Sequence, residues 1–449
     1  MKTIVEPKEK IDKLWGIQRT DTAATYRLMR YLIRVDYNGD VFLQNVITGQ
    51  LVKLDQAEAE LLEKLPATFT PVMEQLIEHQ FIVPNEFDEH QRVVGIRSVL
   101  RKLADKQEKQ GINHITIFPT TACNARCYYC FEKGVKPETM TEQTANDVVE
   151  FINKHYGGKK LWIRWFGGEP TVGAHRISQI CEGLHQRGIE FSSKITTNGY
   201  LFDEEMVEKA CSLWNLESAM ISVDGTRERY NRVKAFVNAC DDPFERVMNN
   251  ISLLLAHGVH VNLRMNFDKQ NYNEFQEILN EAGIRFNGNP LLDVYVHQIN
   301  EHYQNIDSSL IQGDEQWFNE KILELNKLSR KMGLLHKKIE LPRLEYKWCI
   351  AARNDAVTIL PRGQLVSCPE RMNPDQYKGD LIHGINNQDM ICFWRQYADH
   401  DKCSKCCLFP ECIKILNCAG KDRCFYKLER LDQIKELVCN LADSSADEQ

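Results

Sequence analysis

Six strand-like segments alternate with amphipathic segments between residues 114 and 299, and this alternation constrains the fold more than any other feature. Stretches such as TANDVVEFINKHY and DDPFERVMNNISLLLAHG carry apolar residues at helical spacing. Repeated βα units pack as a parallel sheet with right-handed crossovers. We therefore expect an α/β fold, closed either as an open doubly wound sheet or as a partial (β/α)6 barrel. The strand-like segments are 114–120, 161–166, 193–198, 219–224, 260–267 and 292–299.

Polar and glycine-rich motifs follow the first four of these segments. CNARCYYC (123–130) comes after the first, GGEP (167–170) after the second and TTNG (196–199) after the third, while SVDG (222–225) closes the fourth. Ligands of parallel α/β folds bind at the carboxyl ends of the strands. We therefore expect the four motifs to meet at one site.

The composition indicates how the cysteines should be interpreted. The chain has 16 cysteines and a net charge of −7, so it lacks the basic footprint of a nucleic-acid-binding protein. It contains no apolar run near the ~20 residues of a spanning helix, and MKTIVEPKEKIDKLW lacks the apolar core of a secretory signal. We expect a cytoplasmic protein without membrane contact. In that reducing compartment, cysteines favour metal binding or catalysis over disulfides.

The triplet Cys123-x3-Cys127-x2-Cys130 has the chemistry of a cluster ligand set. Three thiolates can hold three corners of a cubane iron–sulfur cluster and leave the fourth iron open for substrate chemistry. A zinc loop is the alternative, but no second Cys-x2-Cys hook lies nearby. Five lone cysteines in helix-like apolar patterns are expected as small core residues: Cys181, Cys211, Cys240, Cys392 and Cys439.

CNARCYYC resembles the Cx3CxΦC motif of the radical S-adenosylmethionine (SAM) superfamily, and the resemblance covers residues 113 to about 300. It implies a SAM-binding [4Fe-4S] cluster and a 5′-deoxyadenosyl radical that abstracts hydrogen from a substrate. Two interpretations of Thr197 and Asn198 remain: they contact the ribose of SAM, or they cap the turn between a strand and a helix. The implied SAM contacts are Tyr129 at the adenine, Gly167 and Gly168 where the backbone approaches closely, Glu169 at the methionine ammonium, and Ser222 and Arg264 at the carboxylate.

The cysteines beyond residue 345 resemble the SPASM extension of radical SAM enzymes that modify peptides and proteins. The resemblance implies two auxiliary [4Fe-4S] clusters, giving three clusters in all. Five residues lie between Cys412 and Cys418 where the family pattern has three, and this departure puts the first auxiliary cluster in question, because Cys418 would be one of its ligands. A zinc ribbon is the alternative to these iron–sulfur clusters. Cys407 is a second candidate for the ligand position given to Cys406. The implied ligands are Cys349, Cys368 and Cys418 for the first auxiliary cluster, and Cys403, Cys406, Cys412 and Cys424 for the second.

The N-terminal region alternates around the turn signals YNGD and TGQ and then becomes helical. Its order resembles the small winged-helix module with which peptide maturases capture a leader peptide as an added edge strand. A cap over the barrel is the alternative. The expected organisation is a peptide-recognition module at 1–85, a helical linker at 86–112, a radical SAM core at 113–340 and a SPASM-like domain at 341–449.

The resemblance implies a maturase that installs a thioether, C–C or C–N crosslink in a ribosomally made precursor peptide. An electron donor such as flavodoxin or ferredoxin would be its second partner. A sulfatase-maturating enzyme is the alternative, but Pro369 stands where that branch has its aspartate base. A non-catalytic iron–sulfur scaffold is the alternative from another class. We name no catalytic base: His297 is expected in the core or at the rim, and Glu370 and Asp380 as solvated carboxylates.

Overall fold

A computed structural model describes the chain over most of its length. The described residues are 1–108, 111–286, 288–299, 315–345, 349–396, 401–412, 417 and 426–447. A ten-stranded sheet in the order β13-β12-β11-β10-β9-β8-β14-β15-β16-β17 dominates the fold. Its six barrel strands are β8 (His114–Thr120), β9 (Leu161–Gly167), β10 (Phe191–Thr197), β11 (Leu216–Val223), β12 (His260–Phe267) and β13 (Leu292–Gln298).

The six barrel strands are parallel and follow one another in chain order, which confirms the predicted α/β partial barrel. Each predicted strand is present, and those at 114–120 and 260–267 have the predicted bounds. The connecting helices carry the amphipathic stretches. They are α5 (Glu142–His155), α6 (Ala174–Gln186), α7 (Glu204–Ser212), α8 (Arg227–Lys234), α9 (Pro243–Ala256), α10 (Phe275–Phe286) and α11 (Glu315–Lys331).

The C-terminal region extends the barrel sheet. β14 pairs in parallel with β8, and β15, β16 and β17 then continue the sheet in antiparallel fashion. One sheet therefore crosses the boundary predicted at residue 340. The C-terminal elements are β14 (Ala356–Ile359), β15 (Gln364–Val366), β16 (Tyr377–Asp380), β17 (Gly384–Ile385), α12 (Gln388–Phe393), α13 (Asp401–Ser404) and α14 (Tyr426–Asp447).

The N-terminal module contains two small sheets, in the orders β1-β5-β4-β3 and β6-β2-β7. The predicted sequence of strands, helices and a closing strand is present, and β1 is an addition that pairs with β5. The elements are β1 (Lys2–Val5), α1 (Glu9–Trp15), β2 (Thr25–Leu28), β3 (Leu32–Tyr37), β4 (Asp40–Asn45), β5 (Leu51–Lys53), α2 (Gln56–Leu62), β6 (Ala67–Thr68), α3 (Glu74–Glu78) and β7 (Ile82–Pro84).

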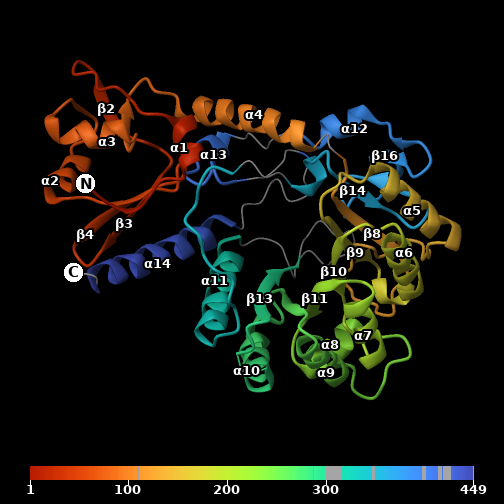
Figure 1. The fold of residues 1–449 in the computed structure, drawn as a ribbon. Helices are drawn as coiled ribbons and strands as arrows, with labels where there is room; N and C mark the ends of the chain where they lie inside the picture. Colours follow the sequence, from red (N-terminus) through yellow and green to blue (C-terminus); the bar gives the residue numbers. More distant parts are fainter. Residues whose placement is uncertain are drawn as a thin grey trace.

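The helix expected as a linker at 86–112 is α4 (Glu89–Glu108), and one face of it packs into the N-terminal core. Val93, Ile96 and Leu100 are buried in the N-terminal core, which also contains Ile434 and Val438 of α14. In Figure 1, α4 runs from the N-terminal module towards β14, and α14 lies against the N-terminal sheet. The module and the C-terminal region therefore share one apolar core.

Two further observations concern single features of the chain. Cys181 is buried as predicted, but Cys240 and Cys392 are exposed, so the core prediction is wrong for these two. Cys240 lies in the loop between α8 and α9, and Cys392 lies on α12, a short helix with no buried residue. Among the described residues, no helix is long and apolar enough to cross a membrane.

Candidate active site

The cysteine triplet lies in the loop after β8, and all three cysteines line one cavity at the carboxyl ends of the barrel strands. Neighbouring loops hold its backbone. The Glu169 amide donates to the Ala122 carbonyl at 2.9 Å, and the Arg126 amide donates to the Lys234 carbonyl at 2.7 Å. The triplet loop is thus fixed by the segments that follow β9 and end α8, as a shared site requires.

Gly167 and Gly168 let two backbones touch. A Cβ at Gly167 would lie 2.3 Å from the Thr120 carbonyl oxygen, and one at Gly168 would lie 2.4 Å from that of Thr121. Gly167 also has a φ of +124°, which disfavours a side chain. The two glycines therefore let the loop after β9 approach the end of β8 and the triplet loop closely, and their contact with SAM stays a prediction. Both residues line the cavity as well.

Glu169 is buried, and both oxygens of its carboxylate accept hydrogen bonds from other residues of the protein. One oxygen accepts from the Thr171 amide at 3.0 Å, the Thr171 hydroxyl at 2.5 Å and the Thr197 hydroxyl at 2.7 Å. The other accepts from the Asn198 amide at 2.7 Å. Burial raises the pKa of Glu169, against the effect of these hydrogen bonds. Glu169 therefore joins the loops after β9 and β10, and its contact with a SAM ammonium stays a prediction.

The sequence interpretation missed Lys234, which lies at the end of α8 and is 2% exposed. Its ammonium donates to the Ser222 hydroxyl at 2.7 Å and pairs with Asp224 at 2.9 Å. Tyr129 donates to Asp224 at 2.5 Å and accepts from Asn266 at 3.1 Å. Although burial disfavours the ammonium, Asp224 raises the pKa of Lys234. No spacing in the sequence signals this network, because its members come from four separate segments.

The inner faces of β12 and β13 are polar. Arg264 lines the cavity, and its Nε is buried without a hydrogen-bond partner among the described residues. His297, expected in the core or at the rim, also lines the cavity, and burial followed by Arg264 lowers its pKa to about 4. Arg164 on β9 lines the cavity too and donates to Thr196 at 3.1 Å. The sequence interpretation did not single out Arg164.

The two carboxylates of the C-terminal region differ in position. Glu370 is exposed as expected, but it also lines the cavity, directly after Pro369. Asp380 is outside the cavity, and it accepts from the amides of Ile382 at 2.9 Å and His383 at 2.7 Å. Asp380 therefore caps its own turn.

The site fits a cluster better than a single ion. Among the described residues, no three His, Cys, Asp or Glu side chains are grouped closely enough to hold one metal ion. A cubane binds each thiolate through a different iron, so its ligands lie farther apart. Burial raises the pKa of Cys123 to about 12 and that of Cys130 to about 11. Bound cationic metal would favour the thiolate forms of both residues.

The C-terminal cysteines occupy two places. Cys349 and Cys368 pack against one small apolar cluster that contains Trp394. Cys403, Cys406 and Cys407 pack against the core shared by the N-terminal module and α14. Cys418 and Cys424 lie outside the described residues.

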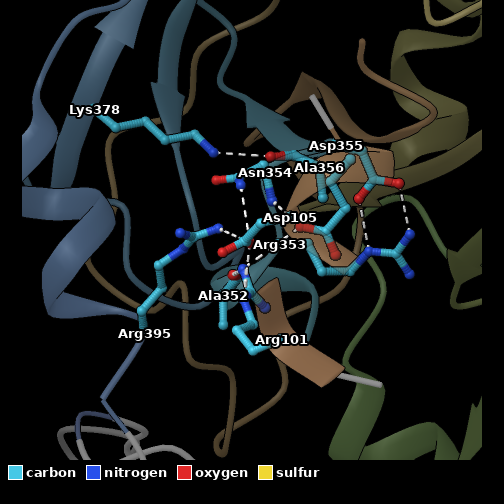
Figure 2. Close-up of polar contacts among 10 residues, drawn as sticks. Arg101, Asp105, Ala352, Arg353, Asn354, Asp355, Ala356, Lys378 and Arg395 are labelled. Atoms are coloured by element: carbon cyan, nitrogen blue, oxygen red, sulfur yellow. Dashed lines mark hydrogen bonds and ion pairs between the residues drawn. The ribbon is translucent and has the colours of Figure 1, made fainter. Parts of the chain in front are cut away.

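Helix α4 contacts the segments that carry these cysteines. Figure 2 shows Arg101 donating to the Ala352 carbonyl, at 2.8 Å, and Asp105 accepting from Arg395, at 2.9 Å. One turn earlier on the helix, Arg97 donates to three carbonyls, those of Phe409, Pro410 and Cys412. One helix of the N-terminal region thus holds both cysteine-bearing loops.

The parallel partial barrel with a three-cysteine loop at its carboxyl rim defines a class of iron–sulfur enzyme. Residues 117–282 match the radical SAM superfamily, and the chain therefore contains a radical SAM enzyme domain. A GTP 3′,8-cyclase of Chlorobaculum tepidum is 31% identical over 149 residues. That match covers 32% of this chain and 42% of the cyclase, so the chain spans less than half of that relative.

Two solved structures share more of the fold. One is anSMEcpe with bound AdoMet, which is 15% identical with a TM-score of 0.56 and covers 75% of this chain and 100% of its own. The other is Streptococcus suis SuiB bound to its precursor peptide SuiA, at 15% identity and a TM-score of 0.53, covering 86% of this chain and 94% of SuiB. At these identities the likeness concerns the fold alone.

Proposed function

We propose that the chain is a radical SAM peptide maturase that abstracts hydrogen from a residue of a precursor peptide and installs a thioether, C–C or C–N crosslink. The observation that carries the proposal is the cavity shared by Cys123, Cys127 and Cys130 with Arg264 and Ser222. It combines a cluster ligand set with the half-buried guanidinium of Arg264, whose buried Nε–H has no hydrogen-bond partner among the described residues. That N–H and the Ser222 hydroxyl suit the carboxylate of SAM.

When bound, the cluster and SAM supply a one-electron reductive cleavage that yields methionine and the 5′-deoxyadenosyl radical. The chain contributes orientation. Gly167 and Gly168 hold the triplet loop against the loop after β9, and the Lys234–Asp224 pair holds Tyr129. Electrons come from a donor such as flavodoxin or ferredoxin.

Two auxiliary clusters form part of the proposal. The first would use Cys349, Cys368 and Cys418. Asn417, the residue before Cys418, donates to the Phe393 carbonyl at 2.6 Å, and Phe393 packs in the apolar cluster of Cys349 and Cys368. This contact supports Cys418 as a ligand despite its unusual spacing. The second cluster would use Cys403, Cys406, Cys412 and Cys424.

The N-terminal module is the proposed site for the leader of the precursor. Its four-stranded sheet ends in β3, which pairs only with β4 among the described strands, and an extended peptide can add to such an edge. SuiB, whose fold this chain shares over most of its length, was solved with a precursor peptide. The shared core with α14 places this module beside the cysteine-bearing loops.

Formylglycine generation on a sulfatase is the second candidate. Pro369 cannot act as a base, but Glu370 lines the cavity one residue later and offers a carboxylate. A substrate test distinguishes the two candidate functions, because only a sulfatase maturase would oxidise the Cys or Ser of a sulfatase-derived peptide.

The proposal is tested on anaerobically reconstituted protein, beside a variant with Cys123, Cys127 and Cys130 changed to Ala. We expect about twelve irons per chain, four for each cubane, and triplet-dependent 5′-deoxyadenosine after addition of SAM and dithionite. Zinc in place of iron, or no 5′-deoxyadenosine from a fully loaded protein, would contradict the radical mechanism and favour a scaffold.

A further inference from the structure

Arg164, on β9, places a guanidinium in the cavity of the cysteine triplet. Its Cζ lies 4.3 Å from the centre of the Phe166 ring, and its Nη2 donates to the Thr196 hydroxyl at 3.1 Å. Phe166 and Thr196 line this cavity themselves, whereas the alternate residues of β9, Ile163 and Trp165, are buried in the core on the other face. The guanidinium of Arg164 is therefore held on the inner face of the barrel. The function proposed above gives it no task.

The cavity carries more positive charge than the carboxylate of SAM requires. Besides the cysteines, its charged lining residues are Arg164, Lys234, Arg264 and Glu370. Lys234 is paired with Asp224 at 2.9 Å, and Glu370 is exposed, so that water screens its charge. SAM has one carboxylate, for which Arg264 is the proposed partner. The guanidinium of Arg164 is left for a second anion.

The two guanidiniums of the cavity are close enough to influence each other. Burial lowers the pKa of Arg164, Glu370 raises it and Arg264 lowers it. Tyr295, which pairs in register with Arg264, reports the same proximity: burial raises its pKa, and both arginines lower it. Like charges in a partly buried site repel each other, and a bound anion relieves that repulsion. A carboxylate at Arg164 would therefore stabilise the site as well as be bound by it.

We propose that the Arg164 guanidinium binds a carboxylate of the substrate peptide, from an acidic side chain or from the C-terminus, and so positions the peptide in the cavity. The inference rests on the proposed peptide substrate. A guanidinium binds a carboxylate through two parallel N–H···O bonds, and the contacts with Phe166 and Thr196 hold that fork in place before binding. Glu370, which lines the same cavity, lies two residues after Cys368. The bound carboxylate would thus lie between the triplet loop and the segment that carries Cys368.

The test measures binding of two matched pairs of probes to the anaerobically reconstituted, full-length protein with SAM bound and no reductant. N-acetylglutamate N-methylamide carries a side-chain carboxylate and is compared with N-acetylglutamine N-methylamide. N-acetylalanine carries a terminal carboxylate and is compared with its N-methylamide. In at least one pair the carboxylate should bind about tenfold more tightly, as a charge-assisted pair of hydrogen bonds gives, and that pair identifies the source. No preference in either pair, or no binding of either carboxylate, would overturn the inference.

Arg164→Met removes the charge, and Lys194→Met is the matched control. Lys194 pairs in register with Arg164 from the neighbouring strand β10, but it is exposed and lies outside the cavity. Arg164→Met should abolish the carboxylate preference and leave the Kd of SAM unchanged, whereas Lys194→Met should change neither. Weaker SAM binding in Arg164→Met would assign the arginine to the SAM carboxylate, and an equal loss in Lys194→Met would show a general effect of charge. Either result would contradict the inference.

Arg164→Lys provides a second variant that is closer to the natural side chain. It keeps the charge without the planar fork, so it should retain only part of the carboxylate preference and bind SAM as the unaltered protein does. A full preference in this variant would show that the fork plays no part in binding. The proposed function fails separately, on 5′-deoxyadenosine formation from SAM and dithionite, which none of these probes enters.

Discussion

Arg101 of α4 donates to the carbonyl of Ala352 at 2.8 Å. Ala352 lies three residues after Cys349, which we propose as a ligand of the first auxiliary cluster. Arg97, one turn earlier, donates to the Cys412 carbonyl at 2.6 Å. Helix α4, which follows the N-terminal module, is thereby bonded to two different cysteine-bearing loops.

These contacts predict separable losses of iron. Arg101→Gln should reduce the iron content by about four per chain, one cubane, because the Cys349 loop loses its anchor to α4. Arg97→Gln should remove a similar amount from the Cys412 loop. Iron and sulfide are counted after anaerobic reconstitution, and 5′-deoxyadenosine formation reports the triplet cluster. If both variants contain as much iron per chain as the unaltered protein, the two arginines do not support cluster assembly.

Gly168→Ala should prevent assembly at the triplet. The new Cβ would lie 2.4 Å from the Thr121 carbonyl oxygen and 2.5 Å from that of Ala122, so the triplet loop must shift. Gly188→Ala is the control, because no atom lies within 4 Å of its Cβ although its φ is +64°. The expected result is loss of SAM-dependent 5′-deoxyadenosine in the first variant only. Comparable activity in both would contradict the close packing of the two loops.

Lys234→Met should destabilise the apoprotein strongly. The substitution leaves the Asp224 carboxylate, 1% exposed, without its cation, and breaking a buried pair typically costs about 3–5 kcal/mol. Urea unfolding followed by circular dichroism measures the change. Combining Lys234→Met with Asp224→Asn should restore part of the loss, since the orphaned charge is removed. Additive losses in the double variant would argue against direct coupling.

Lys378 predicts a pH dependence of stability. Burial, followed by Arg395, lowers its pKa to about 8. Its ammonium donates to the Ala356 carbonyl at 2.9 Å, as Figure 2 shows. Between this pKa and that of an unfolded lysine, the unfolded state binds more protons, so the Lys378 contribution to stability rises with pH.

Lys378→Met removes this titration. Its stability relative to the unaltered protein should therefore be greatest near pH 7 and should decline as the pH rises above about 8. Urea unfolding at a series of pH values gives the difference. A difference that stays constant across this range would show that Lys378 titrates as an ordinary lysine.

Much of the barrel was predictable because its signals are local. A strand such as His260–Phe267 alternates apolar and polar residues, and this pattern depends only on neighbours in sequence. The triplet Cys123, Cys127 and Cys130 was found in the same way. Lys234 and Arg164 could not be found, because their partners are brought together only by the order of strands in the sheet.

The sequence by itself determined the six βα units, the cysteine triplet after the first strand and the glycines that follow the second. Tertiary structure alone decided that α4 is part of a core, that His297 lines the cavity and that Lys234 is buried beside Asp224. The physical reason is distance along the chain. Periodicity and turn chemistry act over a few residues, whereas burial and hydrogen bonding depend on segments hundreds of residues apart, such as Arg97 and Cys412.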